Sequence, residues 1–361
     1  MFGHMRKSSI VVFSLVAALW AGSPAQAQTA PSAPAPRGAK VRIARWLDIQ
    51  NATLNLRYRF IDTSAGIVAT NQLQHRQSLR ARVKFDKPGR YALNFGIFTG
   101  TRFTSGWDNT GWGINDTQKN FNLKTLYLAA QPAAGIGVEI GGLSLAHGES
   151  TEITAYDDDG YIAGERLRIR RPARLFFDEI SVTNAYFSGT GAASVPVHRR
   201  LPHIDEPNYQ QFLLGKSLGA RAAVSADYTI ERGRRTWREA VRLRIRETRI
   251  VDAIVLEHYQ RTNAGPASGF AVAVERTLTR KLRVNGGYAR IDPGHGSLNG
   301  DRFNIGRRVF AVATYQLSPP LQVSWYVTAA VGRNGVLPQR TLYNTALTYD
   351  MLPALKRKGW L

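Results

Sequence analysis

The chain has 361 residues, no cysteine and a formal net charge of +22, from 48 Lys and Arg against 26 Asp and Glu. The lack of cysteine excludes a fold held together by disulfides. A positive excess of this size usually indicates a nucleic-acid partner, but residues 1–27 predict export, so nucleic acid is not an expected partner. Anionic solutes, polysaccharides or lipid phosphates are better candidates.

Residues 1–27 have the three parts of a secretory signal peptide. Arg6 and Lys7 precede an apolar run, IVVFSLVAALWAG, and the sequence AQA at 25–27 supplies an A-x-A cleavage site. An uncleaved membrane anchor is the alternative, but the run is shorter than the roughly 20 residues that a bilayer-spanning helix needs. Residues 28–40 are rich in Pro and Ala, and we interpret them as a flexible periplasmic leader.

From residue 41 onward, apolar and polar side chains alternate one by one in many segments. WREAVRLRIRE at 237–247 shows this most clearly, because Val241, Leu243 and Ile245 alternate with three arginines. A period of two predicts a β-strand with two unlike faces. Sixteen such strands are predicted, at 54–60, 77–86, 90–100, 121–130, 135–146, 161–172, 174–187, 210–218, 220–231, 237–247, 253–262, 268–278, 281–291, 304–317, 321–332 and 340–351.

The connections between these strands differ in length from one end of the hairpins to the other. Short turns such as 131–132 alternate with long loops, notably 101–120, 147–160 and 188–207. This asymmetry is typical of outer-membrane barrels, and a sheet can cross a bilayer only if it closes on itself. We therefore predict an all-β protein, a transmembrane antiparallel β-barrel of about 16 strands (range 14–18) over residues 41–352, followed by a basic tail at 353–361. An exported soluble solenoid or sandwich is the alternative.

If the apolar parity faces lipid, the basic residues of the strands line the pore. Placing them on the lipid side would cost roughly 2–4 kcal/mol each at the bilayer midplane, and arginine rings in a pore attract anions. Alternatively, the arginines pair with acidic residues of the barrel wall, for which the candidates are Glu165, Glu179, Asp227, Glu231, Glu247 and Glu257. The predicted pore-lining residues are Arg57, Arg59, Arg80, Arg82, Lys84, Arg166, Arg168, Arg170, Arg242, Arg244 and Arg246.

Two loops contain further candidates. The carboxylates of Asp157, Asp158 and Asp159 could coordinate Ca²⁺, although an acidic loop tip is more often simply solvated, and we assign no metal site. Trp107 and Trp112 could stack on sugars, fold inward as a constriction or anchor their loop at the lipid interface.

Catalysis is not expected. His147 and Ser150 stand close together in AHGES, but no orienting third group or oxyanion site is recognisable. No cofactor is expected either. A barrel with a surface binding or hydrolase role stays as the alternative to a channel.

The strand and loop layout, with N-terminal strands NLRYRF and HRQSLRARVKF, resembles bacterial outer-membrane porins and specifically the alginate-export type. The detailed likeness covers about the first quarter of the chain. The resemblance implies an outer-membrane channel whose arginine-rich lumen conducts an acidic polysaccharide. We accordingly expect passage of small hydrophilic solutes, with anionic solutes or acidic saccharides preferred or with weak selectivity. The expected surroundings are outer-membrane lipid and lipopolysaccharide, and the flat apolar walls fit both a monomer and a homotrimer.

Overall fold

The structure, a computed structural model, describes residues 46–63, 67–100, 106–114, 117, 119–149, 161–170, 176–188, 196–245, 250–263, 267–292, 306–332 and 340–358. All of them lie in one compact unit, Lys40–Leu361. Within the described ranges, no helix is long and apolar enough to cross a bilayer.

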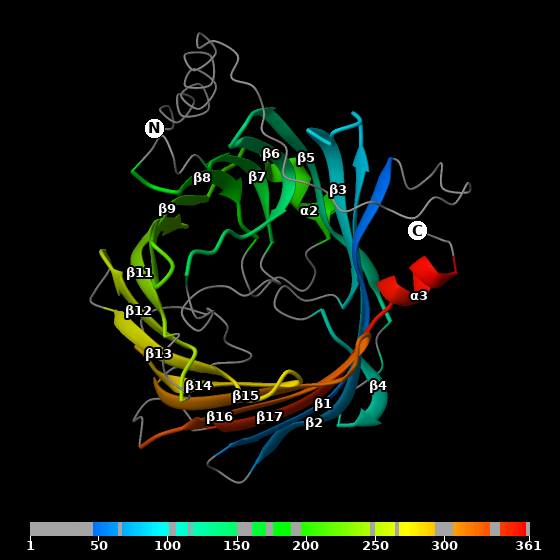
Figure 1. The fold of residues 1–361 in the computed structure, drawn as a ribbon, viewed down its shortest axis with the longest axis vertical. Coiled ribbons are helices and arrows are strands. Elements are labelled where there is room, and N and C mark those ends of the chain that lie inside the picture. Colours follow the sequence, from blue (N-terminus) through cyan, green and yellow to red (C-terminus); the bar gives the residue numbers. More distant parts are fainter. Residues whose placement is uncertain are drawn as a thin grey trace, which may run out of the picture. The chain divides into compact units, whose positions relative to one another are not determined.

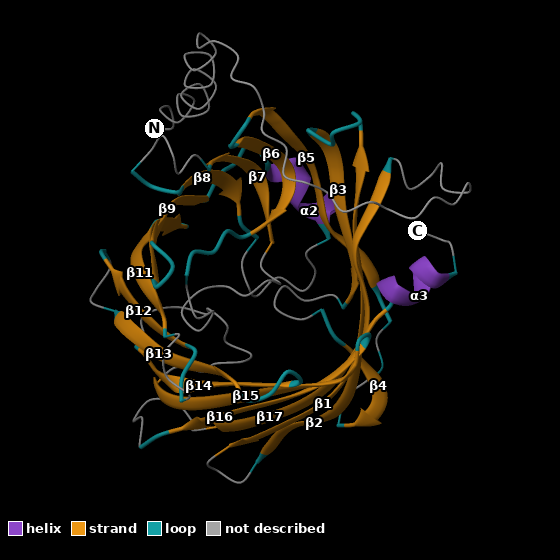
Figure 2. Ribbon diagram, in the orientation of Figure 1, coloured by secondary structure: helices purple, strands orange, loops and turns teal. Residues whose placement is uncertain are grey.

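Antiparallel strands make up most of this unit (Figure 1). The first eight are β1 (Leu47–Thr63), β2 (Val68–Lys84), β3 (Tyr91–Thr99), β4 (Asp108–Gly113), β5 (Phe121–Ala133), β6 (Ile136–Ser144), β7 (Tyr161–Ile169) and β8 (Glu179–Tyr186). The others are β9 (Tyr209–Leu218), β10 (Ala222–Glu231), β11 (Arg234–Arg244), β12 (Ala253–Arg261), β13 (Ser268–Thr277), β14 (Leu282–Ile291), β15 (Gly306–Ser318), β16 (Leu321–Ala330) and β17 (Arg340–Asp350). Figure 2 shows helices only as small additions to the strands: α2 (Val197–Arg200), the 3₁₀ turn η2 (Leu201–His203) and α3 (Leu352–Arg357).

The sheet closes into a barrel because β17 pairs with β1 along eleven residue pairs, from Thr53↔Asp350 to Thr63↔Arg340. Each strand pairs with its neighbour in the chain, except that β3 pairs directly with β5. Of the 17 strands, β4 therefore stands outside the ring and continues along β2 beyond the end of β3. The ring has sixteen strands, which confirms the predicted fold class.

The prediction that 101–120 is entirely loop is wrong. Residues 108–113 form β4, whose sequence DNTGWG lacks alternation. It becomes a strand because β2 extends past β3 and offers free backbone groups at Gln72 and Gln74. Both β1 and β2 are 17 residues long, well beyond their predicted spans. The predicted loop at 188–207 likewise contains α2 and η2, and α3 occupies much of the predicted tail.

The two faces of the barrel differ in chemistry. Along β1, Leu54 and Leu56 are each 42% exposed, whereas Arg57 and Arg59 are each 7% exposed on the opposite face. Since cross-strand partners share a face, the register extends this assignment around the ring. The outer face carries exposed large apolar side chains, which include Leu128, Phe212, Leu256, Val309, Trp325 and Leu347. The inner face is largely polar, with an apolar cluster around Val255, Tyr259, Ala273 and Phe310.

Two turns are fastened by a carboxylate that precedes a strand. Asp178 accepts the backbone N–H of Ser217 at 2.7 Å, and Asp252 accepts that of Thr277 at 2.6 Å. These backbone hydrogen bonds lower the pKa of both carboxyl groups, and Lys216 and Arg276 add to the effect. Each contact ties the end of the neighbouring strand to the turn.

Candidate functional site on the inner face of the barrel

The inner face of β1 and β2 is strongly basic. Register and alternation place six basic residues there: Arg57, Arg59, Arg76, Arg80, Arg82 and Lys84. Among the described residues on the inner face of β1–β3, the one carboxylate is Asp48, which pairs with Arg82 at 2.8 Å. We call these six residues the basic wall. Arg80 lies 5.1 Å from the ring centre of Phe98, and neither Arg80 nor Lys84 has an ion pair within the described ranges.

Trp107 covers the part of the basic wall nearest the loop end. The Arg57 guanidinium lies 4.0 Å from the centre of this indole, and that of Arg76 lies 4.8 Å away. Arg57 also donates from Nε to Gln74 Oε1 at 2.9 Å. Trp112 behaves differently, because it is 56% exposed and its ring lies 5.8 Å from that of Tyr58 on the outer face. One tryptophan thus turns inward and the other outward.

On the opposite side of the ring, β11 also carries inward-facing arginines, but these have acidic neighbours. Arg238 contacts Asp227 on β10 at 3.0 Å and Glu257 on β12 at 3.3 Å. All three side chains are buried, with at most 9% exposure. The two carboxylates therefore compensate the positive charge of Arg238.

Arg242 also lies between two carboxylates. Its Nε contacts Glu149 at 2.8 Å, and its Nη1 contacts Glu275 on β13 at 2.7 Å. Glu149 belongs to the described segment 145–149 after β6, so this segment lies inside the barrel. Gln211 of β9 donates to the Ala146 carbonyl at 3.1 Å, and Glu149 N–H donates to Ser225 Oγ of β10 at 2.8 Å. Residues 145–149 thus cross the inner face of β9–β11.

The arginines of β7 also meet carboxylates on their neighbours. Arg166 contacts Glu139 at 3.0 Å, Arg168 contacts Glu179 at 3.2 Å, and Arg170 contacts Glu179 at 3.0 Å. Glu165, by contrast, is paired in register with Ile140, which is 40% exposed on the outer face. Its proposed role as an inward-facing partner of the arginines is wrong, because odd residues in this part of β7 point outward.

The predicted site residues thus separate into two groups. Arg166, Arg168, Arg170 and Arg242 are paired with acids across the wall, whereas Arg80 and Lys84 on β2 have no ion pair within the described ranges. Arg244 lies at the end of β11 and has no ion pair within the described part of the chain. Arg246, Glu247, Asp157, Asp158 and Asp159 lie outside the described residues.

Two features escaped sequence reasoning. Glu149 is one, because the charged pattern of β11 gives no sign of a partner 93 residues away. The other is Arg200 in α2, which is fully buried and donates to the backbone carbonyls of Ile162 (2.7 Å) and Lys124. Burial lowers the pKa of Arg200 to about 10. The guanidinium anchors α2 to β5 and β7.

The described ranges contain no group of three His, Asp or Glu residues that could hold a metal ion. His147 is described, but Ser150 lies outside the described residues.

Comparisons with known proteins support the fold. No protein-family model and no curated protein matches the sequence. Among solved structures, a triple mutant of the porin of Rh. blastica aligns over 84% of this chain and 99% of its own, with a TM-score of 0.56 and 9% sequence identity. OmpF of Salmonella typhi, in complex with daunomycin, aligns over 84% of this chain and 97% of its own, with a TM-score of 0.55 and 12% identity.

The chain therefore has a porin-like fold, a closed barrel of sixteen antiparallel strands. At these identities the likeness concerns the fold.

Proposed function

We propose that this chain is an outer-membrane channel that passes small hydrophilic solutes and prefers anions. The observation that carries the proposal is the pairing of a closed barrel with a polar, charged inner face and an outer face of exposed apolar side chains. A closed sheet leaves no backbone group unpaired at an edge, which is what lipid requires. The exposed apolar face then contacts outer-membrane lipid and lipopolysaccharide.

The anion preference rests on the basic wall. Among the described residues on the inner face of β1–β3, Asp48 is the one carboxylate beside these six basic residues, and neither Arg80 nor Lys84 has an ion pair within the described ranges. Arg238 and Arg242 on the opposite wall each lie between two carboxylates. Arg80 and Lys84 are therefore available to attract anions. An arginine guanidinium can bind a carboxylate in bidentate fashion. The basic wall would therefore favour acidic solutes, including acidic saccharides such as those conducted by porins of the alginate-export type.

The loop segment 145–149 narrows the lumen on the side opposite the basic wall. It is held by Gln211, Ser225 and Arg242. A passing solute would therefore travel between this segment and β1–β2. The ion pairs on one side of the pore and the basic wall on the other side would create an electric field across the pore. This field would orient charged solutes.

Planar-bilayer recording tests the channel. The protein without residues 1–27, refolded in detergent and added to a lipid bilayer, should give stepwise open conductance, and a heat-denatured sample should give none. A folded barrel without conductance would contradict the proposal and favour a surface binding or hydrolase role. Cross-linking in detergent, followed by electrophoresis, distinguishes a monomer from a homotrimer.

A further inference from the structure

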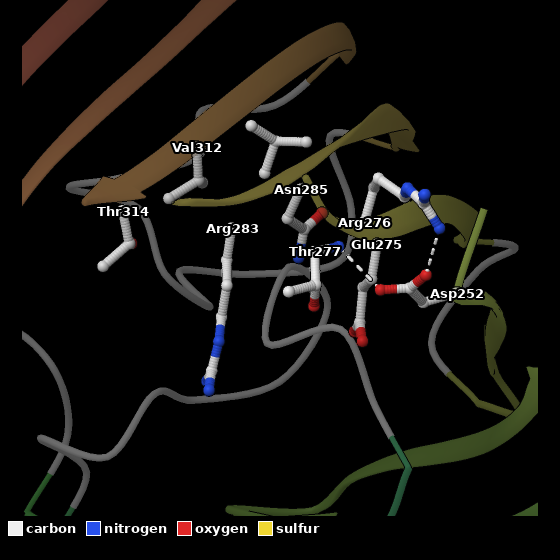
Figure 3. Close-up of a pocket in the computed structure, with 9 residues that line it drawn as sticks. Asp252, Glu275, Arg276, Thr277, Arg283, Asn285, Val312 and Thr314 are labelled. Atoms are coloured by element: carbon white, nitrogen blue, oxygen red, sulfur yellow. Dashed lines mark hydrogen bonds and ion pairs between the residues drawn. The ribbon is translucent and has the colours of Figure 1, made fainter. Parts of the chain in front are cut away.

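A cavity of about 290 Å³ opens on β13–β15, at the end of the barrel with the short turns (Figure 3). The residues that line it are Asp252, Glu275, Arg276, Thr277, Arg283, Val284, Asn285, Val312 and Thr314. Its volume is at the lower end of the range for small-molecule pockets, roughly 300–1,000 Å³. It is large enough for one monosaccharide rather than for several linked units.

The register places the chemically active members of this set on the inner face. Thr277, Arg283 and Thr314 form one cross-strand row, and Glu275, Asn285 and Val312 form the next. Both rows continue the inner face that carries the apolar cluster around Ala273 and Phe310. These side chains therefore lie on the lumen side of the sheet.

Arg283 supplies an available positive charge. It is exposed and has no ion pair or side-chain hydrogen bond within the described residues. Arg276 differs, since its Nη1 contacts Asp252 at 2.6 Å, as the dashed line in Figure 3 shows. Of the two arginines that line the cavity, Arg283 is thus the one that can pair with an anion.

The side-chain oxygen atoms of Asn285 and Glu275 are hydrogen-bond acceptors that a ligand with donor groups could satisfy. The Oδ1 atom of Asn285 is buried and has no hydrogen-bond partner among the described residues, and such an atom is costly unless a donor reaches it. Arg242 contacts Glu275 through Oε1. A bare anion such as chloride or acetate offers no donor to these acceptors.

We propose that this cavity is a binding subsite for a hydroxylated carboxylate, a sugar acid of one ring. Its carboxylate pairs with Arg283, its hydroxyl groups donate to Asn285 Oδ1 and Glu275, and the side chain of Val312 contacts its apolar face. The proposal rests on the proposed channel function, because the subsite faces the lumen. It adds a binding position for a single sugar acid, at the mouth formed by the short turns and away from the basic wall of β1 and β2.

Current block by glucuronate, with glucose and acetate as comparison solutes, tests the subsite. Glucuronate should reduce the chloride current of the refolded protein at concentrations where glucose and acetate do not. Arg283→Gln should raise the half-blocking glucuronate concentration about tenfold, since a charge-assisted hydrogen bond is lost. Arg290→Gln is the matched control, because Arg290 lies on the outer face of the same strand, and it should leave the block unchanged.

Asn285→Ala separates a sugar-acid site from a simple anion site. It should weaken the block by glucuronate while leaving any weak effect of acetate unchanged. Equal block by acetate and glucuronate in the unmodified protein would overturn the proposal, as would an Arg283→Gln variant that folds, conducts and is blocked normally.

Calorimetric titration of the detergent-solubilised protein with glucuronate separates the two proposals. Binding that requires Arg283, without any conductance, would contradict the channel and support the subsite. Conductance without glucuronate binding would contradict the subsite and leave the channel standing.

Discussion

Replacing Arg238 with methionine should destabilise the barrel strongly. Arg238 contacts Asp227 at 3.0 Å and Glu257 at 3.3 Å, and the three side chains are 9%, 7% and 0% exposed. Methionine keeps most of the volume but leaves two carboxylates buried without their cation. Removing one partner of a buried ion pair costs about 3–5 kcal/mol. The hydroxyl of Thr229, which donates to Asp227 at 3.0 Å, compensates only part of this cost.

The assay is equilibrium unfolding by guanidinium of the protein refolded in lipid vesicles, followed by tryptophan fluorescence and by heat-dependent gel mobility. Arg290→Met is the control, because Arg290 is 52% exposed and its contact with Asp292 is 3.4 Å. Exposed pairs of this kind contribute about 0–1 kcal/mol. The triple variant Arg238→Met, Asp227→Asn, Glu257→Gln should recover most of the loss, because no unpaired charge is left. A loss below about 1 kcal/mol for Arg238→Met alone, or no recovery in the triple variant, would show that Arg238 does not compensate the two buried carboxylates.

Three further predictions concern selectivity, pH and backbone geometry. Neutralising Arg80 and Lys84 together should reduce anion preference in bilayer recordings. Arg290→Gln, which removes a cation from the outer face, should leave the preference unchanged. An unchanged preference in the double variant would count against the basic wall. The backbone amide at the end of β13 lowers the pKa of Asp252 in the folded state. Asp252 therefore contributes to stability above its pKa in the unfolded chain, about 3.9. This contribution is lost as the pH falls through its lower pKa in the folded state. Unfolding curves of Asp252→Asn and the unmodified protein should therefore differ at pH 7 and converge in strong acid, and a constant difference would contradict the linkage. Gly141→Ala should lower the yield of folded barrel, because φ is +131° and an added Cβ would lie 2.4 Å from a backbone carbonyl oxygen of β5. Such backbone strain costs of order 1–3 kcal/mol. A normal yield of folded barrel in the gel-mobility assay would be inconsistent with this strain.

The alternation of side chains was sufficient to predict the barrel. Each of the sixteen ring strands corresponds to a predicted segment, because the two faces contact different surroundings and so require different residues. β4 was missed for a physical reason. Its residues do not alternate, and the strand exists because β2 leaves backbone groups available beyond β3.

The partners of the charged residues were much harder to predict. Pairing of β7 and β11 arginines with acids was one of two alternatives, and the sequence could not choose between them, because the choice depends on register and on loop folding. Arg242 illustrates the difficulty, since one of its two glutamates lies two strands away on β13 and the other, Glu149, lies in the segment that follows β6. The cavity at Arg283 was missed for the same reason. It combines side chains of three strands whose sequences show nothing unusual individually.

The reversal potential of the open channel in a potassium chloride gradient reports directly whether the pore prefers anions. Because Arg80 and Lys84 of the basic wall face the lumen without an ion pair among the described residues, we expect a potential displaced toward the chloride equilibrium value, and a smaller displacement at high salt because the charges are screened. A potential displaced toward the potassium equilibrium value in the unmodified protein would contradict an anion-preferring channel.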